Sequence, residues 1–196
     1  MRELERLLLD ASPAARRRNV VVAHGFGGIG KTQLAVEFAR SHQHRFTSIF
    51  WLDGSSEARL KQSFVEAMAR LPQSELTGEG AEALKQSQPD TDVAVRECLQ
   101  WLSLSSNPNW LLIFDNVDRD FHDKDDPQAY NVKNYFPHPD HGSILITSRL
   151  ASLSRHGSGV KVGTVAAEQA LAILENSAGK VVESKCIAID RDTGFP

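Results

Sequence analysis

The chain has 196 residues and a formal net charge of −3, with 41% hydrophobic and 24% charged residues. This length is sufficient for one α/β domain with a substantial core, and the weak negative charge gives no support for a nucleic-acid or anionic-membrane partner. The two cysteines do not suggest a disulfide framework. The chain has no signal-peptide core at its N-terminus and no apolar run of membrane-spanning length. We therefore expect a cytoplasmic protein.

Short apolar segments alternate along the chain with segments that have the periodicity of amphipathic helices. Strands are expected at residues 20–23, 46–52, 110–114, 143–147 and 160–165. Helices are expected at about residues 4–11, 31–42 and 167–174, with two more beginning after Ser55 or Ser56 and after Asp92. A loop or weak helix is expected at residues 72–92, and a long polar loop at 116–141. This alternation predicts an α/β protein with three layers, in which helices cover both faces of a mainly parallel five-stranded sheet.

A glycine-rich segment follows the first expected strand and precedes a helix. Gly25, Gly30, Lys31 and Thr32 match the phosphate-loop pattern G-x-x-x-x-G-K-[ST]. In such a loop the glycines let backbone N–H groups curl around phosphate oxygens, and the start of the helix favours the same anion. Lys31 is expected to reach the β- and γ-phosphates, and the Thr32 hydroxyl to help hold Mg²⁺. The sequence therefore predicts that the chain binds a nucleoside phosphate.

Polar residues also follow the later strands. Asp115 ends an apolar run, as does the Walker B aspartate that holds Mg²⁺ in phosphate-loop proteins. Arg149 follows the strand at 143–147, where a guanidinium can contact the γ-phosphate and distinguish a triphosphate from a diphosphate. Because the carboxyl ends of parallel strands meet at one edge of a sheet, we expect the phosphate loop, Asp53, Asp115 and Arg149 to lie there together.

The residue after Asp115 is Asn116, whose amide cannot accept a proton. Many related ATPases have a second acid at this position that polarises the attacking water, and general-base catalysis contributes roughly 10²–10⁴-fold to a rate. Asp118 is a candidate for the same role, but the sequence does not place its carboxylate. We therefore expect strong nucleotide binding with slow hydrolysis.

Three segments resemble the NB-ARC family of STAND-class NTPases, namely residues 25–35, 111–118 and 142–149. Residues 50–56 are similar to the fungal branch, which includes NOD-like receptors. The resemblance covers about residues 2–176. It implies a P-loop NTPase domain that holds ADP at rest, exchanges it for ATP and self-associates in the ATP state. It also implies the strand order 2-3-4-1-5.

The resemblance further implies roles for single residues. Lys31, Asp115 and Arg149 are the candidate catalytic residues, with Asp115 as the Walker B aspartate and Arg149 as sensor 1. The metal ligands are expected to be Thr32 and Asp115. The residues expected to contact ATP or ADP are Gly25, Gly27, Gly28, Ile29, Gly30, Lys31, Thr32, Gln33 and Arg149.

We expect an N-terminal helix and linker at residues 1–18, an NB-ARC-like nucleotide-binding domain at 19–178 and an atypical tail at 179–196. Because the helical and winged-helix segments of the family do not follow, the chain is expected to be truncated after this domain. The leading hypothesis is an ADP/ATP-binding signalling switch domain of a NOD-like receptor involved in defence or programmed cell death. Its expected partners are copies of itself or full-length receptors. An active P-loop phosphotransferase or ATPase, and a fragment without independent activity, are the alternatives.

Overall fold

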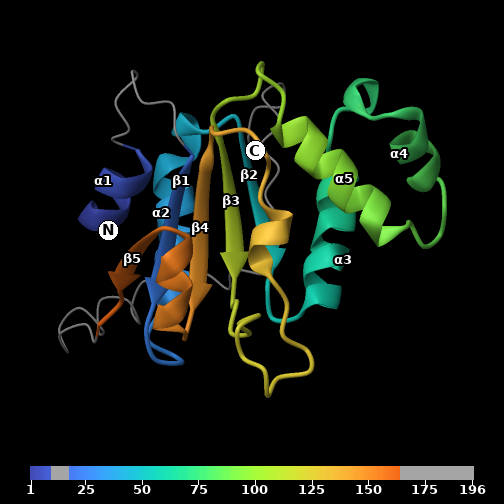
Figure 1. Cartoon of the computed structure of the whole chain (residues 1–196). Coiled ribbons are helices and arrows are strands. Elements are labelled where there is room, and N and C mark those ends of the chain that lie inside the picture. Colours follow the sequence, from blue (N-terminus) through green and yellow to red (C-terminus); the bar gives the residue numbers. More distant parts are fainter. Residues whose placement is uncertain (10–17, 164–196) are drawn as a thin grey trace, which may run out of the picture.

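The computed structural model describes residues 1–9 and 18–163, and these residues form a five-stranded sheet between layers of helices (Figure 1). The strands are β1 (Asn19–His24), β2 (Ser48–Asp53), β3 (Trp110–Asp115), β4 (Ser143–Ser148) and β5 (Ser158–Lys161). They lie in the order β2-β3-β4-β1-β5, and every neighbouring pair is parallel. The fold class predicted from the sequence is therefore confirmed, as is the strand order that the family resemblance implies.

Successive residues of the strands face opposite sides of the sheet, and each side packs against its own helices. Leu112 and Ile144 belong to the core shared with α3 (Glu57–Met68) and α5 (Thr91–Leu102). Leu111 and Leu145 belong to the core shared with α1 (Arg2–Leu8) and α2 (Lys31–His42). Strands β3 and β4 are buried along almost their whole length, as is typical of parallel strands that are covered on both faces.

The helix starts differ in detail from the prediction. Ser56, and not Ser55, caps α3 by accepting a hydrogen bond from the Arg59 N–H. The prediction of Asp92 as the cap of α5 is wrong, because Asp90 lies before the first turn with extended backbone and accepts from the Asp92 and Val93 N–H groups. Asp92 lies in the first helical turn and forms an ion pair with Lys61 on α3 at 2.7 Å.

The connecting segments contain short helices. The segment expected as a loop or weak helix holds η2 (Gln73–Glu75) and α4 (Gly78–Ala83). The 3₁₀ helix η1 (Gln43–Arg45) precedes β2, while η3 (Val132–Tyr135) lies in the long loop after β3 and η4 (Ala151–His156) precedes β5. Within residues 1–9 and 18–163, no helix combines the length and the apolar character that a membrane crossing requires.

The last strand begins two residues before its predicted start and ends at Lys161, before its predicted end. Among the described strands, β5 pairs with β1 alone, in a register that places Val21 opposite Ser158. Its first two residues are the exposed Ser158 and Gly159, so the apolar residues farther along the chain were a misleading guide to its position. The helix predicted at 167–174 and the tail at 179–196 lie outside the described residues, as does most of the predicted linker before residue 18.

Parallel pairing brings the carboxyl ends of the central strands to one edge of the sheet. The register places Asp53 opposite Asp115 and His24 opposite Ser148. In Figure 1 the blue loop after β1 and the yellow loop after β3 lie at this same end of the molecule. This edge therefore collects the chain segments that carry the residues predicted to bind nucleotide.

Candidate functional site

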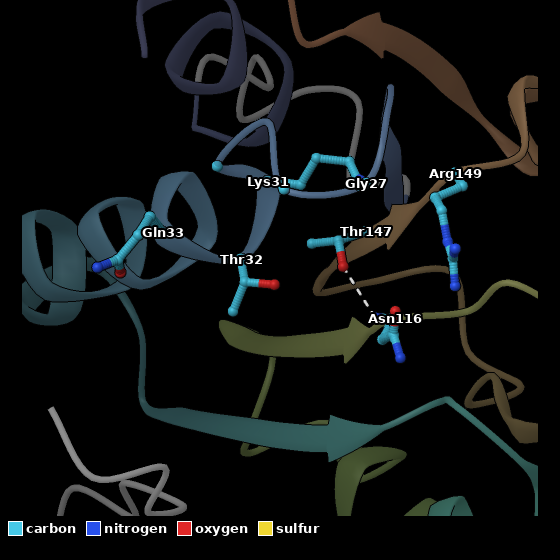
Figure 2. Close-up of a pocket in the computed structure, with 9 residues that line it drawn as sticks. Gly27, Lys31, Thr32, Gln33, Asn116, Thr147 and Arg149 are labelled. Carbon is cyan, nitrogen blue, oxygen red and sulfur yellow. Dashed lines mark hydrogen bonds between the residues drawn. The ribbon is translucent and has the colours of Figure 1, made fainter. Parts of the chain in front are cut away.

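A pocket of about 380 Å³ opens at the carboxyl edge of the sheet (Figure 2). It is formed by the loop after β1, the start of α2 and the ends of β3 and β4. The residues that line it are Gly27, Gly28, Gly30, Lys31, Thr32, Gln33, Asn116, Thr147 and Arg149. Its volume lies in the usual range for small-molecule sites, about 300–1,000 Å³. Seven of the lining residues were predicted as site residues, and the structure brings these seven together.

The loop between β1 and α2 has the backbone conformation of an anion cradle. Gly28 and Gly30 have φ angles of 74° and 95°, which lie in the left-handed region that favours glycine. Gly30 is the residue before α2, and no side chain caps the helix there. Because the first N–H groups of a helix have no intrahelical acceptor, they are available to an anion in the pocket. The loop therefore fits phosphate oxygens.

Gly25 and Ile29 were predicted to contact nucleotide but do not line the pocket. The Gly25 N–H donates to the Ser148 carbonyl at 3.2 Å, and the Ile29 N–H donates to the Phe26 carbonyl at 3.4 Å. A Cβ on Gly25 would lie 2.5 Å from the Val162 carbonyl oxygen. In this structure both residues support the shape of the loop, and Gly27, Gly28 and Gly30 line the cavity.

The Lys31 ammonium group is bound to the loop itself. Its Nζ donates to the carbonyl oxygens of Gly25 and Phe26, at 2.9 Å in each case. These are neutral acceptors, whereas a phosphate oxygen is negatively charged and adds a direct electrostatic attraction to the ammonium group. A phosphate in the pocket therefore competes favourably for this ammonium group.

Asp115 and Thr32 form the arrangement expected of a magnesium site. The Thr32 hydroxyl donates to Asp115 Oδ1 at 2.9 Å, which leaves the lone pairs of the hydroxyl oxygen for a cation. The described residues contain no cluster of three or more His, Cys, Asp or Glu side chains that suits a metal. Mg²⁺ at phosphate sites does not need one, because it is held by one or two carboxylates together with phosphates and water. The residues present therefore fit this ion.

Arg149 reaches the pocket from the end of β4 and is bound to Asp118. Its backbone N–H donates to Asp118 Oδ1 at 2.6 Å, and its Nε donates to Asp118 Oδ2. Both carboxylate oxygens of Asp118 are thus engaged, and Asp118 is not among the residues that line the pocket. This geometry does not support Asp118 as a substitute for the second acid.

Asp53 lies at the predicted edge but outside the pocket lining. Its carboxylate accepts from the Ser55 N–H at 2.9 Å and lies 3.7 Å from the Arg59 guanidinium. The side chain is therefore directed toward the start of α3. The topology predicted its position along the edge correctly, but a side-chain interaction determines the direction in which it points.

Two pocket residues had no predicted contact. The sequence indicates only that Asn116 lacks the carboxylate of a second acid. Its backbone has a φ of 62°, which asparagine tolerates better than most residues. Thr147 is 1% exposed and follows an apolar run in β4. The sequence feature that could have identified Thr147 as a site residue is its polar side chain at the end of an apolar run, two positions before Arg149.

Comparison with known proteins gives the family. Residues 2–183 match the NB-ARC domain. The chain is 24% identical over 173 residues to a nucleotide-binding leucine-rich repeat (NLR)-like protein of the fungus Hyaloscypha variabilis, an alignment that covers 83% of this chain and 16% of that protein. A crystal structure of a STAND protein with a tetratricopeptide repeat sensor, from Pyrococcus horikoshii, is 17% identical with a TM-score of 0.47 and covers 92% of this chain and 25% of its own. Because the match to the NB-ARC domain extends over most of its length, the chain belongs to the NB-ARC family.

Proposed function

We propose that this chain is a nucleotide-operated switch domain that binds ADP or ATP with Mg²⁺ and hydrolyses ATP slowly. The observation that carries the proposal is the single pocket in which the phosphate loop, Lys31 and Arg149 meet beside the Thr32–Asp115 pair. Membership of the NB-ARC family supports it, because domains of this family bind nucleotide. The individual roles follow from the contacts of each residue.

The loop and the start of α2 bind the phosphates. The N–H groups of Gly27, Gly28 and residues 30–33 serve the anion, and Lys31 exchanges its two loop carbonyls for β- and γ-phosphate oxygens. Thr32 and Asp115 would hold Mg²⁺, and the ion would supply positive charge that neutralises the phosphates. Gly25 and Ile29 act indirectly, by maintaining the shape of the loop.

Arg149 distinguishes ATP from ADP. Among the described residues, its hydrogen bonds use the backbone N–H and Nε, so the two Nη groups remain available as donors. Asp118 holds the guanidinium through Nε, and we infer that the two Nη groups serve the pocket that Arg149 lines. A γ-phosphate provides the charged acceptors that such a guanidinium binds well.

The lack of a carboxylate on Asn116 makes hydrolysis slow. Asn116 lines the pocket directly after Asp115, but its amide does not accept a proton. A slow reaction gives the ATP-bound state a long lifetime, as a switch requires. The chain would therefore spend its time in one nucleotide state or the other, with little turnover.

We place this switch in the cytoplasm, within a NOD-like receptor system for defence or programmed cell death. The support is the similarity to an NLR-like protein of a fungus. The chain spans 16% of the length of that relative, so the sensing and effector functions are assigned to the wider protein or to its partners. Self-association, or association with full-length receptors, is the proposed output of the ATP state.

The test begins with the purified chain. Denaturation should release ADP or ATP in stoichiometric amounts, and phosphate release from Mg-ATP should be very slow. Lys31→Ala should weaken nucleotide binding at least about tenfold, as expected when a charged hydrogen bond is lost. Lys85→Ala is the matched control, because Lys85 is exposed and pairs with Glu82 on α4. Unchanged affinity after Lys31→Ala would contradict the proposal, and fast turnover would favour an active phosphotransferase or ATPase.

A second measurement tests the sensing role. Arg149→Ala should remove most of the difference between the affinities for ATP and ADP, while the affinity for ADP stays close to that of the wild type. Arg40→Ala removes an exposed arginine at the far end of α2 and should change neither affinity. If Arg149→Ala leaves the difference between the affinities for ATP and ADP unchanged, another residue senses the γ-phosphate.

A further inference from the structure

Thr147 is a buried residue whose hydroxyl lies between the Walker B aspartate and the turn that follows it. It belongs to β4, between β1 and β3, and is 1% exposed. Its Oγ1 lies 2.5 Å from Asp115 Oδ1 and 2.9 Å from the backbone nitrogen of Asn116. Figure 2 shows the hydrogen bond between Thr147 and Asn116 at the wall of the pocket.

The directions of these two hydrogen bonds are fixed by simple chemistry. The Asn116 backbone nitrogen can only donate, so the Thr147 oxygen accepts there. The single hydroxyl proton is then free for the Asp115 carboxylate, which can only accept while it is ionised. Thr147 therefore donates to Asp115 and accepts from Asn116 at the same time.

The backbone of Thr147 completes the attachment of the turn. The β3–β4 pairing ends at Phe114 and Ile146, and beyond this point the Val117 N–H donates to the Thr147 carbonyl at 2.9 Å. Thr147 thus makes hydrogen bonds to three consecutive residues after the strand pairing ends. Asn116, in the middle of these three, has left-handed backbone with a φ of 62°, and its N–H donates to the hydroxyl.

The same contacts fix the orientation of the Asp115 carboxylate. Oδ1 accepts from both Thr32 and Thr147. Within residues 1–9 and 18–163 no hydrogen bond is made to Oδ2, which is therefore the oxygen left for water or a cation. A valine would fill the same space in the strand as threonine, so packing alone does not require a hydroxyl at this position.

We propose that Thr147 is a positioning residue for magnesium, whose hydroxyl holds the Asp115 carboxylate against Thr32 and secures the turn at Asn116. The inference rests on the proposed function, because it requires a Mg-nucleotide in this pocket. Groups that orient a metal ligand typically contribute about 10- to 100-fold to metal affinity. Thr147→Val should therefore weaken the apparent affinity for Mg²⁺ in the nucleotide complex by that factor.

The experiment measures binding of a fluorescent ADP analogue to the full chain, first in EDTA and then across a magnesium titration. Thr147→Val should bind the analogue in EDTA nearly as well as the wild type but require more Mg²⁺ to reach the tight-binding state. Thr147→Ser keeps the hydroxyl and should restore the magnesium response. Thr47→Val is the matched control, because it removes a hydroxyl that bonds to Asn107 at 2.6 Å before β2, at the opposite edge of the sheet.

The outcomes separate the inference from the function on which it rests. A normal magnesium response in Thr147→Val, together with a lost response in Asp115→Ala, would overturn the role of Thr147 alone. Equal defects in Thr147→Ser and Thr147→Val would also overturn it, because the hydroxyl would then not be the cause. If the wild type binds no nucleotide, or Asp115→Ala responds normally to Mg²⁺, the proposed site itself is wrong and the inference falls with it. Should Thr147→Val fail to fold, Thr147→Ala takes its place in the comparison with Thr147→Ser.

Discussion

Replacing Asn116 with aspartate should turn this slow nucleotide-binding domain into a faster ATPase. Asn116 lines the pocket next to the Walker B aspartate, and its φ of 62° lies in the left-handed region. Aspartate shares with asparagine a relatively good tolerance of that conformation. Asn116→Asp therefore introduces a carboxylate with little change to the backbone.

The expected increase in the rate of ATP hydrolysis follows from the general-base catalysis that the Asn116 amide does not provide. A positioned general base contributes roughly 10²–10⁴-fold to a rate, or about 3–5 kcal/mol of activation free energy. Glutamate at this position has a longer reach, but it tolerates left-handed backbone poorly, at a cost of about 1–2 kcal/mol. A domain of this size loses roughly 2–4 °C of Tm for each kcal/mol. Asn116→Asp should therefore keep the wild-type Tm, whereas Asn116→Glu should lower it by a few degrees.

The assay is phosphate release at saturating Mg-ATP, with ATP affinity and Tm measured separately, since a new charge near the phosphates weakens binding. Asn116→Ala is the control, because it removes the amide and adds strain without adding a base. The rate should rise in the two acidic variants and stay low in the alanine variant. If Asn116→Asp binds ATP, melts like the wild type and hydrolyses ATP at the wild-type rate, the missing carboxylate is not what limits turnover.

Two further predictions concern stability. Gly25→Ala should destabilise the fold by about 1–3 kcal/mol, the usual effect of overpacking, because its Cβ would lie 2.5 Å from a backbone carbonyl oxygen. Gly27→Ala should be tolerated, since its Cβ would have Arg149 Cδ at 3.7 Å as its nearest neighbour, and equal Tm values for the two variants would contradict the steric argument. Hydrogen bonds from Arg155 hold the pKa of the Asp120 carboxyl well below its usual range. The contribution of the ionised Asp120 to the free energy of unfolding is therefore fully present above the unfolded-state pKa of about 3.9. It is lost as the pH falls toward the folded-state pKa. In urea unfolding, Asp120→Asn should be less stable than the wild type at pH 7 but approach it below pH 4, and a difference that does not change with pH would refute this account.

The sequence was sufficient to predict the sheet and the edge at which the pocket lies. Buried apolar runs identified β3 and β4, and parallel topology then placed Asp115 and Arg149 beside the phosphate loop. Helix starts were harder to predict, because Asp90 and Asp92 both have a side chain suited to capping. Only the backbone conformation decides which of the two accepts from the free N–H groups.

Side-chain directions at the edge could not be predicted from the sequence. Asp53 and Asp115 occupy matching positions on neighbouring strands, yet the carboxylate of Asp53 lies near Arg59 and that of Asp115 is bound to Thr32. The difference arises because separate elements contribute the side chains that these carboxylates contact, and a local sequence pattern does not reveal such contacts. Thr147 was missed for the same reason, because a threonine in a buried strand is ordinary until its two polar partners are known.

The two ion pairs of the loop after β3 have a mechanical consequence. Asp118 is bound to Arg149 and Asp120 to Arg155, so this loop is attached at two points to the segment that follows β4. A guanidinium that moves toward a ligand must either break its bond to Asp118 or draw the loop with it. Phe121, which is 59% exposed, directly follows Asp120. Movement of this loop would therefore shift an exposed aromatic side chain together with Asp120.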